Sequence, residues 1–467
     1  MSLDRVLTHF RNISQIPRGS GNEQAISDYL VTFAQGLGLE VQQDKLNNVI
    51  IKKAGKAGAE PVILQGHMDM VCEKVEGSDH DFLKDAIELV QEGHILRANG
   101  TTLGADNGIA VAMAMALLES DDPELPPLEV LITTSEETDM SGALGLEAGQ
   151  LEGKKLINID SEEEGIITVG SAGGSTLTYK RKIEREPNEF PCYVLDFSGL
   201  LGGHSGMEID KPRGNMLKIM AELIADLMRE TSVRIVELNS GTVDNAIPRN
   251  GKLILAVADR GLLEAAIERS KERVQGIEGE LKIEVSEGAA CPEAYSEALS
   301  RDLVHLISEL PTGVNTMVEG TQLVESSNNL AYVREVDGEI VMQNSLRSSN
   351  HEKLEEHLAR CEKAATAHEF LLSRGAGYPG WEYNPDSELR RHAEAVYREL
   401  TGQEAETLII HAGLECGAIS EKYPGLDMIS IGPNIWDVHT PQEHIDLEST
   451  ARVFDYLVAL LHRLAKS

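Results

Sequence analysis

The sequence is poor in cysteine and basic residues, and it contains no long apolar run. Its five cysteines are widely scattered and form no CxxC pair, which excludes a zinc ribbon and a disulfide framework. The most apolar stretch, residues 109–118, is too short to span a bilayer. The first residues lack the apolar run of a signal peptide. We therefore expect a cytoplasmic protein that does not associate with membranes.

Acidic residues greatly outnumber basic ones. The 467 residues include 42 Lys and Arg against 77 Asp and Glu, which gives a formal net charge of −35. A field of this sign repels phosphate backbones, so general nucleic-acid binding is not expected. With 41% hydrophobic residues and 16 prolines, the composition is that of a globular chain. Its length predicts two or three domains.

The first 170 residues alternate between helix and strand patterns. Continuous apolar strands, such as PVILQG at 61–66 and LEVLITT at 128–134, are separated by helices such as the Ala- and Met-rich segment 105–119. Strands of this kind are typical of a sheet that is buried on both faces. We predict an α/β fold with a mostly parallel sheet flanked by helices.

The pattern changes after residue 170, where the segment SAGGS is a candidate hinge. Residues 176–375 contain the order helix, strand, strand, helix twice, which predicts an inserted α+β domain with two halves. The α/β pattern returns after residue 375. Residues 1–175 and 376–467 are therefore expected to form one discontinuous domain that carries the insertion.

Histidines and acidic residues stand at the ends of the predicted strands or at the start of the helix between them. In open α/β sheets, ligand sites gather beyond the carboxyl ends of the strands. We therefore expect these side chains to converge on one crevice. They are His67, Asp69, Asp106, Glu136, Glu137, Asp160 and His439.

This combination of side chains points to metal. Histidine nitrogens with carboxylate oxygens are the ligands of hydrolytic zinc sites, and the same set admits manganese or cobalt. Crowded carboxylates repel one another, and one or two divalent ions would remove that cost. A carboxylate that bridges two ions holds them ~3.5–4 Å apart. The adjacent Glu136 and Glu137 should diverge, so that one binds metal and the other faces the water.

Each of these residues and motifs, taken alone, has a simpler explanation. A lone histidine after a strand is more often structural, and a glutamate pair is usually a solvated surface. The glycine-rich residues 104–108, GADNG, could form a phosphate loop, but they lack a lysine and carry an acid where phosphate would lie. Only the joint occurrence of these residues at strand ends indicates a site.

Six motifs resemble, in order over essentially the whole chain, the dizinc metallopeptidase family of aminoacylases, glutamate-releasing carboxypeptidases and carnosinases. Within that family, the bacterial aminoacyl-histidine dipeptidases (peptidase D) are the most similar branch. HAGLECG and the doubled middle domain favour this dipeptidase branch over the aminoacylases. The motifs are GHMDMV, GADNGIAVA, TTSEETDMSGA, NIDSEEEG, GGHSGMEIDKPRGN and HAGLECG.

The resemblance implies two zinc ions, with manganese or cobalt as alternatives. His67 and Asp160 would bind one ion, Glu137 and His439 would bind the other, and Asp106 would bridge both.

The resemblance also implies roles beside the metals. Glu136 would be the general base, and Asp69 would orient His67. His439 precedes Thr-Pro, as the family pattern expects, but His444 is an alternative ligand.

In the inserted domain, the resemblance assigns substrate contacts. His204 would stabilise the oxyanion, in its own chain or across a dimer, and Asn245 would bind substrate. Arg347 would grip the substrate carboxylate, with Arg260 as the rival because the two halves offer equivalent places. The insertion would then act as a lid and dimerisation domain of a homodimer.

The implied activity is that of a metal-dependent dipeptidase that hydrolyses Xaa-His and other dipeptides. One alternative is a hydrolase of the same fold that acts on N-acyl amino acids. Another is a non-catalytic acidic metal-binding protein, although such a protein needs no base at Glu136.

Overall fold

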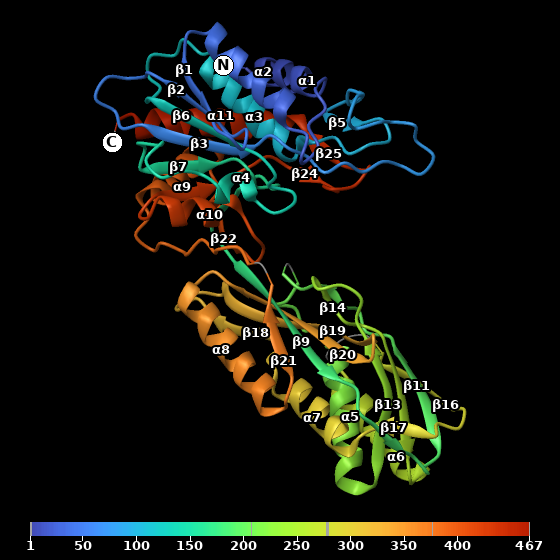
Figure 1. The fold of residues 1–467 in the computed structure, drawn as a ribbon. Coiled ribbons are helices and arrows are strands. Elements are labelled where there is room, and N and C mark those ends of the chain that lie inside the picture. Colours follow the sequence, from blue (N-terminus) through green and yellow to red (C-terminus); the bar gives the residue numbers. More distant parts are fainter. Residues whose placement is uncertain (1, 207, 277–279, 376, 467) are drawn as a thin grey trace. The chain divides into compact units, whose positions relative to one another are not determined.

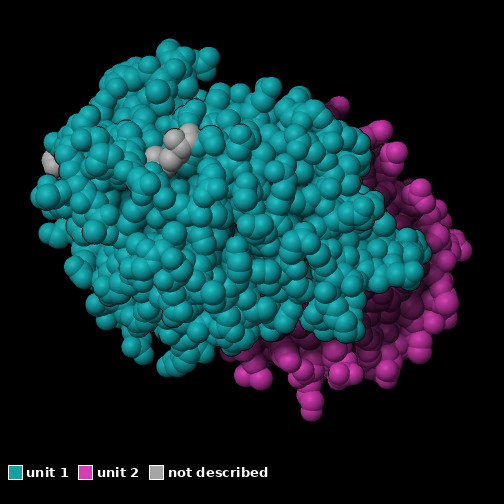
Figure 2. All heavy atoms as spheres, turned by 90° about the horizontal axis from the view of Figure 1, so that it is seen from above, with its two compact units in different colours: residues 1–170, 381–409, 414–467 teal, residues 171–380, 410–413 magenta. Residues whose placement is uncertain are grey.

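The computed structural model describes residues 2–206, 208–276, 280–375 and 377–466. The chain forms two compact units (Figures 1 and 2). Unit 1 comprises Met1–Gly170, Trp381–Ile409 and Leu414–Ser467, and unit 2 comprises Ser171–Gly380 and Ile410–Gly413. Unit 1 is thus built from segments on both sides of unit 2 in the sequence.

An eight-stranded sheet, counted over the described residues, forms the centre of unit 1. Its neighbouring strands β6, β3, β7 and β23 run parallel, while β1 and β2 add an antiparallel edge. The predicted α/β class with a mainly parallel sheet is confirmed. In spatial order the strands are β1 (Glu40–Gln43), β2 (Val49–Lys53), β6 (Leu128–Thr133), β3 (Val62–His67), β7 (Lys155–Asn158), β23 (Asp427–Ser430), β8 (Ile166–Ser171) and β22 (Glu406–Ile410).

Helices accompany this sheet in unit 1. They are α1 (Leu3–Ile13), α2 (Gln24–Gly36), α3 (Ala105–Leu118), α4 (Ser141–Leu144), α9 (Glu388–Thr401), α10 (Glu415–Lys422) and α11 (Leu447–Leu464). Every residue of α3 except Asp106 is buried, as its run of alanines and methionines predicts. None of the helices in the described part of the chain combines the length and the apolar run that a bilayer crossing needs.

Helix α3 packs closely on strand β3 because residue 66 is glycine. A Cβ atom at Gly66 would lie 2.5 Å from Oδ1 of Asn107 and 2.7 Å from Cβ of Ala110. These distances are shorter than van der Waals contact, so a side chain at this position would force the helix away. The close approach brings the start of α3 beside the end of β3.

A small antiparallel sheet completes unit 1. It consists of β24 (Ile435–Trp436), β25 (His444–Asp446), β5 (Ile95–Ala98) and β4 (Leu89–Glu92). Strands β24 and β25 pair with each other, so the intervening residues 437–443 form a loop held at both ends. This loop carries His439.

Unit 2 contains a nine-stranded antiparallel sheet over the described residues. Eight strands follow the order β16 (Lys282–Glu287), β11 (Cys192–Ser198), β15 (Gly251–Val257), β13 (Val233–Ser240), β19 (Val324–Val336), β20 (Glu339–Ser348), β9 (Gly173–Lys182) and β21 (Leu371–Arg374), and β18 (Gly313–Met317) pairs with β19. Two short ribbons pair β10 (Arg185–Pro187) with β17 (Glu293–Tyr295) and β12 (Gly203–His204) with β14 (Ala246–Ile247).

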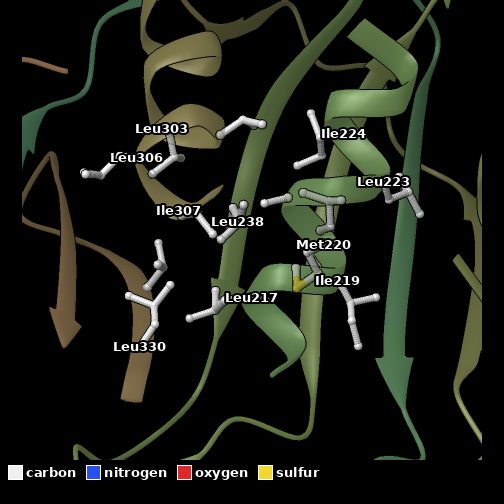
Figure 3. Packing of buried hydrophobic residues seen from close by; sticks show 14 of the residues in the cluster. Leu217, Ile219, Met220, Leu223, Ile224, Leu238, Leu303, Leu306, Ile307 and Leu330 are labelled. Atoms are coloured by element: carbon white, nitrogen blue, oxygen red, sulfur yellow. The ribbon is translucent and has the colours of Figure 1, made fainter. Parts of the chain in front are cut away.

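The core of unit 2 lies between its sheet and its helices. The helices are α5 (Met216–Glu230), α6 (Arg260–Val274), α7 (Glu297–Glu309) and α8 (His351–Ala367). Figure 3 shows Leu217 and Leu223 of α5 and Leu306 of α7 among the buried apolar side chains. Truncating one such leucine to alanine typically costs about 2–5 kcal/mol. The assignment of a lid and dimerisation role to residues 176–375 stays a prediction.

Candidate metal centre

The predicted site residues of unit 1 follow the carboxyl ends of its parallel strands. His67 is the last residue of β3, Glu136 and Glu137 follow β6, and Asp160 follows β7. Since parallel strands end at the same edge of a sheet, these residues meet there. Asp106, at the start of α3, joins them. His439 reaches the same place from the loop between β24 and β25.

Asp106 lies between two histidines. Its Oδ1 atom is 3.2 Å from Nε2 of His67, and its Oδ2 atom is 3.2 Å from Nε2 of His439. Ligand atoms of His67, Asp106 and Glu137 all lie within 4.8 Å of one another. One carboxylate thus offers a separate oxygen on each side.

Each histidine has a further acidic neighbour. Nε2 of His67 lies 3.5 Å from Oδ1 of Asp160, and Nε2 of His439 lies 2.9 Å from Oε2 of Glu137. Two groups of donors therefore share Asp106. One group contains His67 and Asp160, and the other contains His439 and Glu137.

The adjacent glutamates diverge, as the sequence predicts. Glu137 faces His439, whereas Oε2 of Glu136 lies 3.9 Å from Nε2 of His67. The backbone amides of both glutamates donate to the carboxylate of Asp69, over 3.1 and 3.2 Å. The turn that carries the two glutamates is thereby fixed to the segment that follows β3.

Crowding and burial make the acids hard to ionise. Burial raises the pKa of Glu136 well above its usual range, and neighbouring carboxylates add to the effect. Burial also raises the pKa of Glu137 and of Asp160. The nearby Glu162 follows the same trend, because burial raises its pKa to about 7. A compensating positive charge would stabilise the ionised acids.

The histidines show the opposite trend. Hydrogen bonds to Asp106 and Glu137 raise the pKa of His439 to about 11. Burial alone would lower the pKa of His67, but Asp160 and Asp106 outweigh burial and raise it well above its usual range. Burial likewise works against ionisation of Asp106, yet hydrogen bonds from the two histidines hold its pKa below the usual range. The carboxylates around the two histidines thus stabilise positive charge at this place.

The donor set fits divalent metal ions. Two imidazole nitrogens and several carboxylate oxygens are the ligands of catalytic zinc sites, and manganese and cobalt accept them as well. Oε1 of Glu137 is buried and has no hydrogen-bond partner among the described residues. A bound cation would satisfy this oxygen.

His444, the alternative ligand, lies in a different setting. It belongs to β25, where its ring stacks on Trp436 with centroids 5.1 Å apart. Its Nδ1 atom lies 3.7 Å from Asp437. The structure thus brings His439, and not His444, to the cluster around Asp106.

The predicted substrate residues lie in unit 2. His204 of β12 is paired with Ala246 of β14, and the residue before it, Asn245, accepts a hydrogen bond from the amide of Ser205. Burial, together with the charge of Arg347, lowers the pKa of His204. These three predicted residues therefore belong to one region of unit 2.

Arg347 and its rival Arg260 differ in their surroundings. Arg347, in β20, donates from Nη1 to the hydroxyl of Tyr378 over 2.9 Å. Arg260 is exposed at the start of α6, where it pairs with Glu264 and Glu287. Of the two arginines, Arg347 is the one whose charge helps to lower the pKa of His204.

Sequence reasoning missed a set of buried polar residues that support the centre. Asn107 accepts from the amide of His67 and donates to the carbonyl of Ile159. The buried side chains of Arg18 and Glu443 hold neighbouring segments. No local pattern in the sequence marks Arg18 or Glu443, because their partners are backbone groups of distant segments.

Comparisons with known proteins show the family of the chain. Residues 63–463 match the model of peptidase family M20/M25/M40, and the chain belongs to this family. The predicted family and the prediction of a peptidase are thereby confirmed.

Two relatives are similar over nearly their full length. The chain is 37% identical over 473 aligned positions to the cytosol non-specific dipeptidase of Escherichia coli (strain K12), covering 97% of this chain and 96% of the relative. The crystal structure of aminoacylhistidine dipeptidase from Vibrio alginolyticus matches with a TM-score of 0.94 and 34% identity, over 98% of this chain and 96% of that one. Aminopeptidase PepT from Bacillus cereus, with a TM-score of 0.58, 16% identity and coverage of 100% and 99%, shares the fold.

Proposed function

We propose that this protein is a metal-dependent dipeptidase that hydrolyses Xaa-His and other dipeptides in the cytoplasm. The observation that carries the proposal is the pair of histidines on the two oxygens of Asp106, each with a second carboxylate nearby. The names of the Escherichia coli and Vibrio alginolyticus relatives support the substrate class.

We assign two divalent ions to the centre, zinc first and manganese or cobalt as alternatives. His67 and Asp160 would hold one ion, Glu137 and His439 would hold the other, and Asp106 would be a ligand of both. When bound, such ions polarise a carbonyl oxygen and lower the pKa of water. Side chains of the protein carry out the proton transfer and bind the substrate.

Glu136 acts as the general base. It accepts a proton from the attacking water and then passes this proton to the leaving amine of the dipeptide. Its position supports this role, because Oε2 lies 3.9 Å from His67, farther than the oxygens of Asp106 and Asp160. Asp69 holds the ring of His67 in one orientation.

Unit 2 supplies the substrate contacts. His204 donates to the developing oxyanion, and Asn245 binds the substrate. Arg347 grips its carboxylate, because a guanidinium presents two parallel donors. Residues 176–375 act as a lid that excludes water and long peptides, and they carry the contact of a homodimer.

A substrate panel tests the proposal. The purified protein is loaded with zinc, manganese or cobalt and assayed with Xaa-His dipeptides, other dipeptides and N-acyl amino acids. We expect hydrolysis of the dipeptides, and a Glu136→Gln preparation controls for contaminating peptidases. Turnover of the N-acyl amino acids alone would assign the alternative hydrolase, and no turnover with any metal would leave only a metal-binding role.

A further inference from the structure

One carboxylate organises the loop before Asp106. The side chain of Glu443 is 2% exposed, and it accepts hydrogen bonds from four consecutive backbone amides. Its Oε2 atom accepts from Leu103 and Gly104 over 2.7 and 2.9 Å. Its Oε1 atom accepts from Ala105 and Asp106 over 2.8 and 3.2 Å. The glycine-rich loop is therefore bound to an anion from the same chain.

This arrangement needs a carboxylate. The four amides precede or begin α3, where backbone N–H groups have no partner within the helix and the helix dipole favours negative charge. Only an ionised carboxylate offers acceptors on both of its oxygens. A glutamine at position 443 would present an NH₂ donor to two of these four N–H groups.

Arg18 holds the same loop from its other side. It is 2% exposed and donates from Nη1 to the carbonyls of Met68 and Asp69 over 3.0 and 3.3 Å. Its Nη2 atom donates to the carbonyl of Gly104. One guanidinium thus connects the segment that follows His67 to the loop that leads into Asp106.

Gly104 is the point at which the two side chains meet. Its N–H donates to Glu443 and its carbonyl accepts from Arg18. Its φ of +68° is in the left-handed region, and a Cβ atom would lie 2.5 Å from Nη2 of Arg18. Only glycine permits this contact without displacement.

We propose that Arg18 and Glu443 are positioning residues that hold His67 and Asp106 at metal-binding separation before any ion is bound. The inference rests on the proposed function, in which both residues are metal ligands. In the proposed function, Arg18 and Glu443 are neither metal ligands nor the base. They act through the backbone of the two ligand segments.

The test compares two buried, amide-binding glutamates of unit 1. Glu443→Gln changes the residue at the centre, and Glu129→Gln is the matched control. Glu129 is 3% exposed and accepts from the amides of Glu152 and Gly153, near the start of β6 and thus at the opposite end from Glu136. Cobalt(II) affinity and the visible spectrum of bound cobalt are measured, together with hydrogen exchange of amides 103–106 in the metal-free protein.

We expect Glu443→Gln to bind cobalt about 10–100-fold more weakly, with an altered spectrum and faster exchange of amides 103–106. Glu129→Gln should retain the cobalt affinity and spectrum of the wild type even where its melting temperature falls. If Glu443→Gln does not fold, Arg18→Lys takes its place, since lysine keeps the charge but loses the two-pronged contact. The same weakening is expected.

Wild-type cobalt affinity and spectrum in the folded variant would overturn this inference and leave the proposed function intact. Equal losses in Glu443→Gln and Glu129→Gln would also overturn it, because they would reflect stability alone. A wild-type protein that binds no cobalt would refute the proposed function itself, and the inference with it.

Discussion

Asp69 lies against the ring of His67, with its Oδ1 atom 3.3 Å from Nδ1 of that histidine. The same carboxylate accepts from the amides of Glu136 and Glu137 and from the hydroxyl of Ser20. It is fully buried. One side chain therefore fixes both a proposed ligand and the turn that carries the proposed base.

Replacing Asp69 with asparagine tests this relationship. The amide keeps the size of the side chain but offers one acceptor oxygen in place of two, so the ring of His67 or the turn loses a partner. We expect metal affinity or kcat to fall about 10–100-fold, measured by metal titration and steady-state kinetics. Ser20→Ala removes only the hydroxyl contact, and it should cost much less.

Substitutions of Glu136 and Glu137 should distinguish the chemical step from metal binding. Glu136→Gln cannot accept a proton, so kcat should fall ~10²–10⁴-fold while metal content stays normal. Glu137→Gln is the matched variant, and it should lose metal because it removes a charged ligand. Elemental analysis and kinetics of both variants check this assignment. Loss of metal from Glu136→Gln instead would exchange the two roles.

Asp106→Ala should abolish both metal sites. Asp106 is the proposed shared carboxylate. Without it the two ions would lose their common ligand and the negative charge that screens their mutual repulsion. Elemental analysis of wild-type protein should find about two ions per chain. Asp160→Ala is the control, since it removes a ligand of one ion only. Full metal content in Asp106→Ala would contradict the bridging role.

Much of the centre could be predicted because its residues obey a local rule. His67, Glu137 and Asp160 each follow an apolar strand, and parallel strands end at one edge of their sheet. The order of elements along the chain was therefore enough to bring them together. The position of His439 depended on the family resemblance, because no local pattern distinguishes it from His444.

The supporting residues could not be predicted in this way. Arg18 and Glu443 are charged, and charged residues are usually exposed. Their burial depends on pairing with backbone groups far away in the sequence: the amides bound by Glu443 are 337 to 340 residues distant. Only the folded chain brings such groups together.

His411 should make the stability of the metal-free protein depend on acid pH. The side chain is 6% exposed, its Nε2 atom lies 2.6 Å from the hydroxyl of Ser327, and Nδ1 has no partner among the described residues. Burial, with a contribution from Arg347, lowers the pKa of His411 to about 3. Between pH 6.5 and 3, His411 therefore binds a proton in the unfolded chain but stays neutral in the folded chain.

Stability due to neutral His411 is accordingly present above pH 6.5 and is lost as the pH falls, by about 1.4 kcal/mol per pH unit. His411→Gln should remove this slope, which urea unfolding at pH 6.5, 5.5 and 4.5 would measure. His351→Gln changes an exposed histidine and should leave the slope as it is. Equal slopes in wild type and His411→Gln would contradict the prediction.

His204→Ala tests the contribution of unit 2 to the chemical step. If His204 donates to the oxyanion, its loss should lower kcat ~10²–10³-fold. Metal content should not change, because every proposed ligand lies in unit 1. Single-turnover kinetics and elemental analysis check the two expectations. A variant with wild-type kcat would make GGHSG a structural turn only.

A mixing experiment then asks whether His204 acts within its own chain or across the proposed dimer. Subunits with His204→Ala are combined with Glu136→Gln subunits under conditions that permit exchange. If His204 acts across the interface, each mixed dimer has one centre with both defects and one with neither, so activity should return. Half of the dimers in an equal, random mixture are mixed, and each restores one centre of two. Recovery should therefore approach about a quarter of wild-type activity in a symmetric dimer. No recovery despite demonstrated subunit exchange would assign His204 to its own chain.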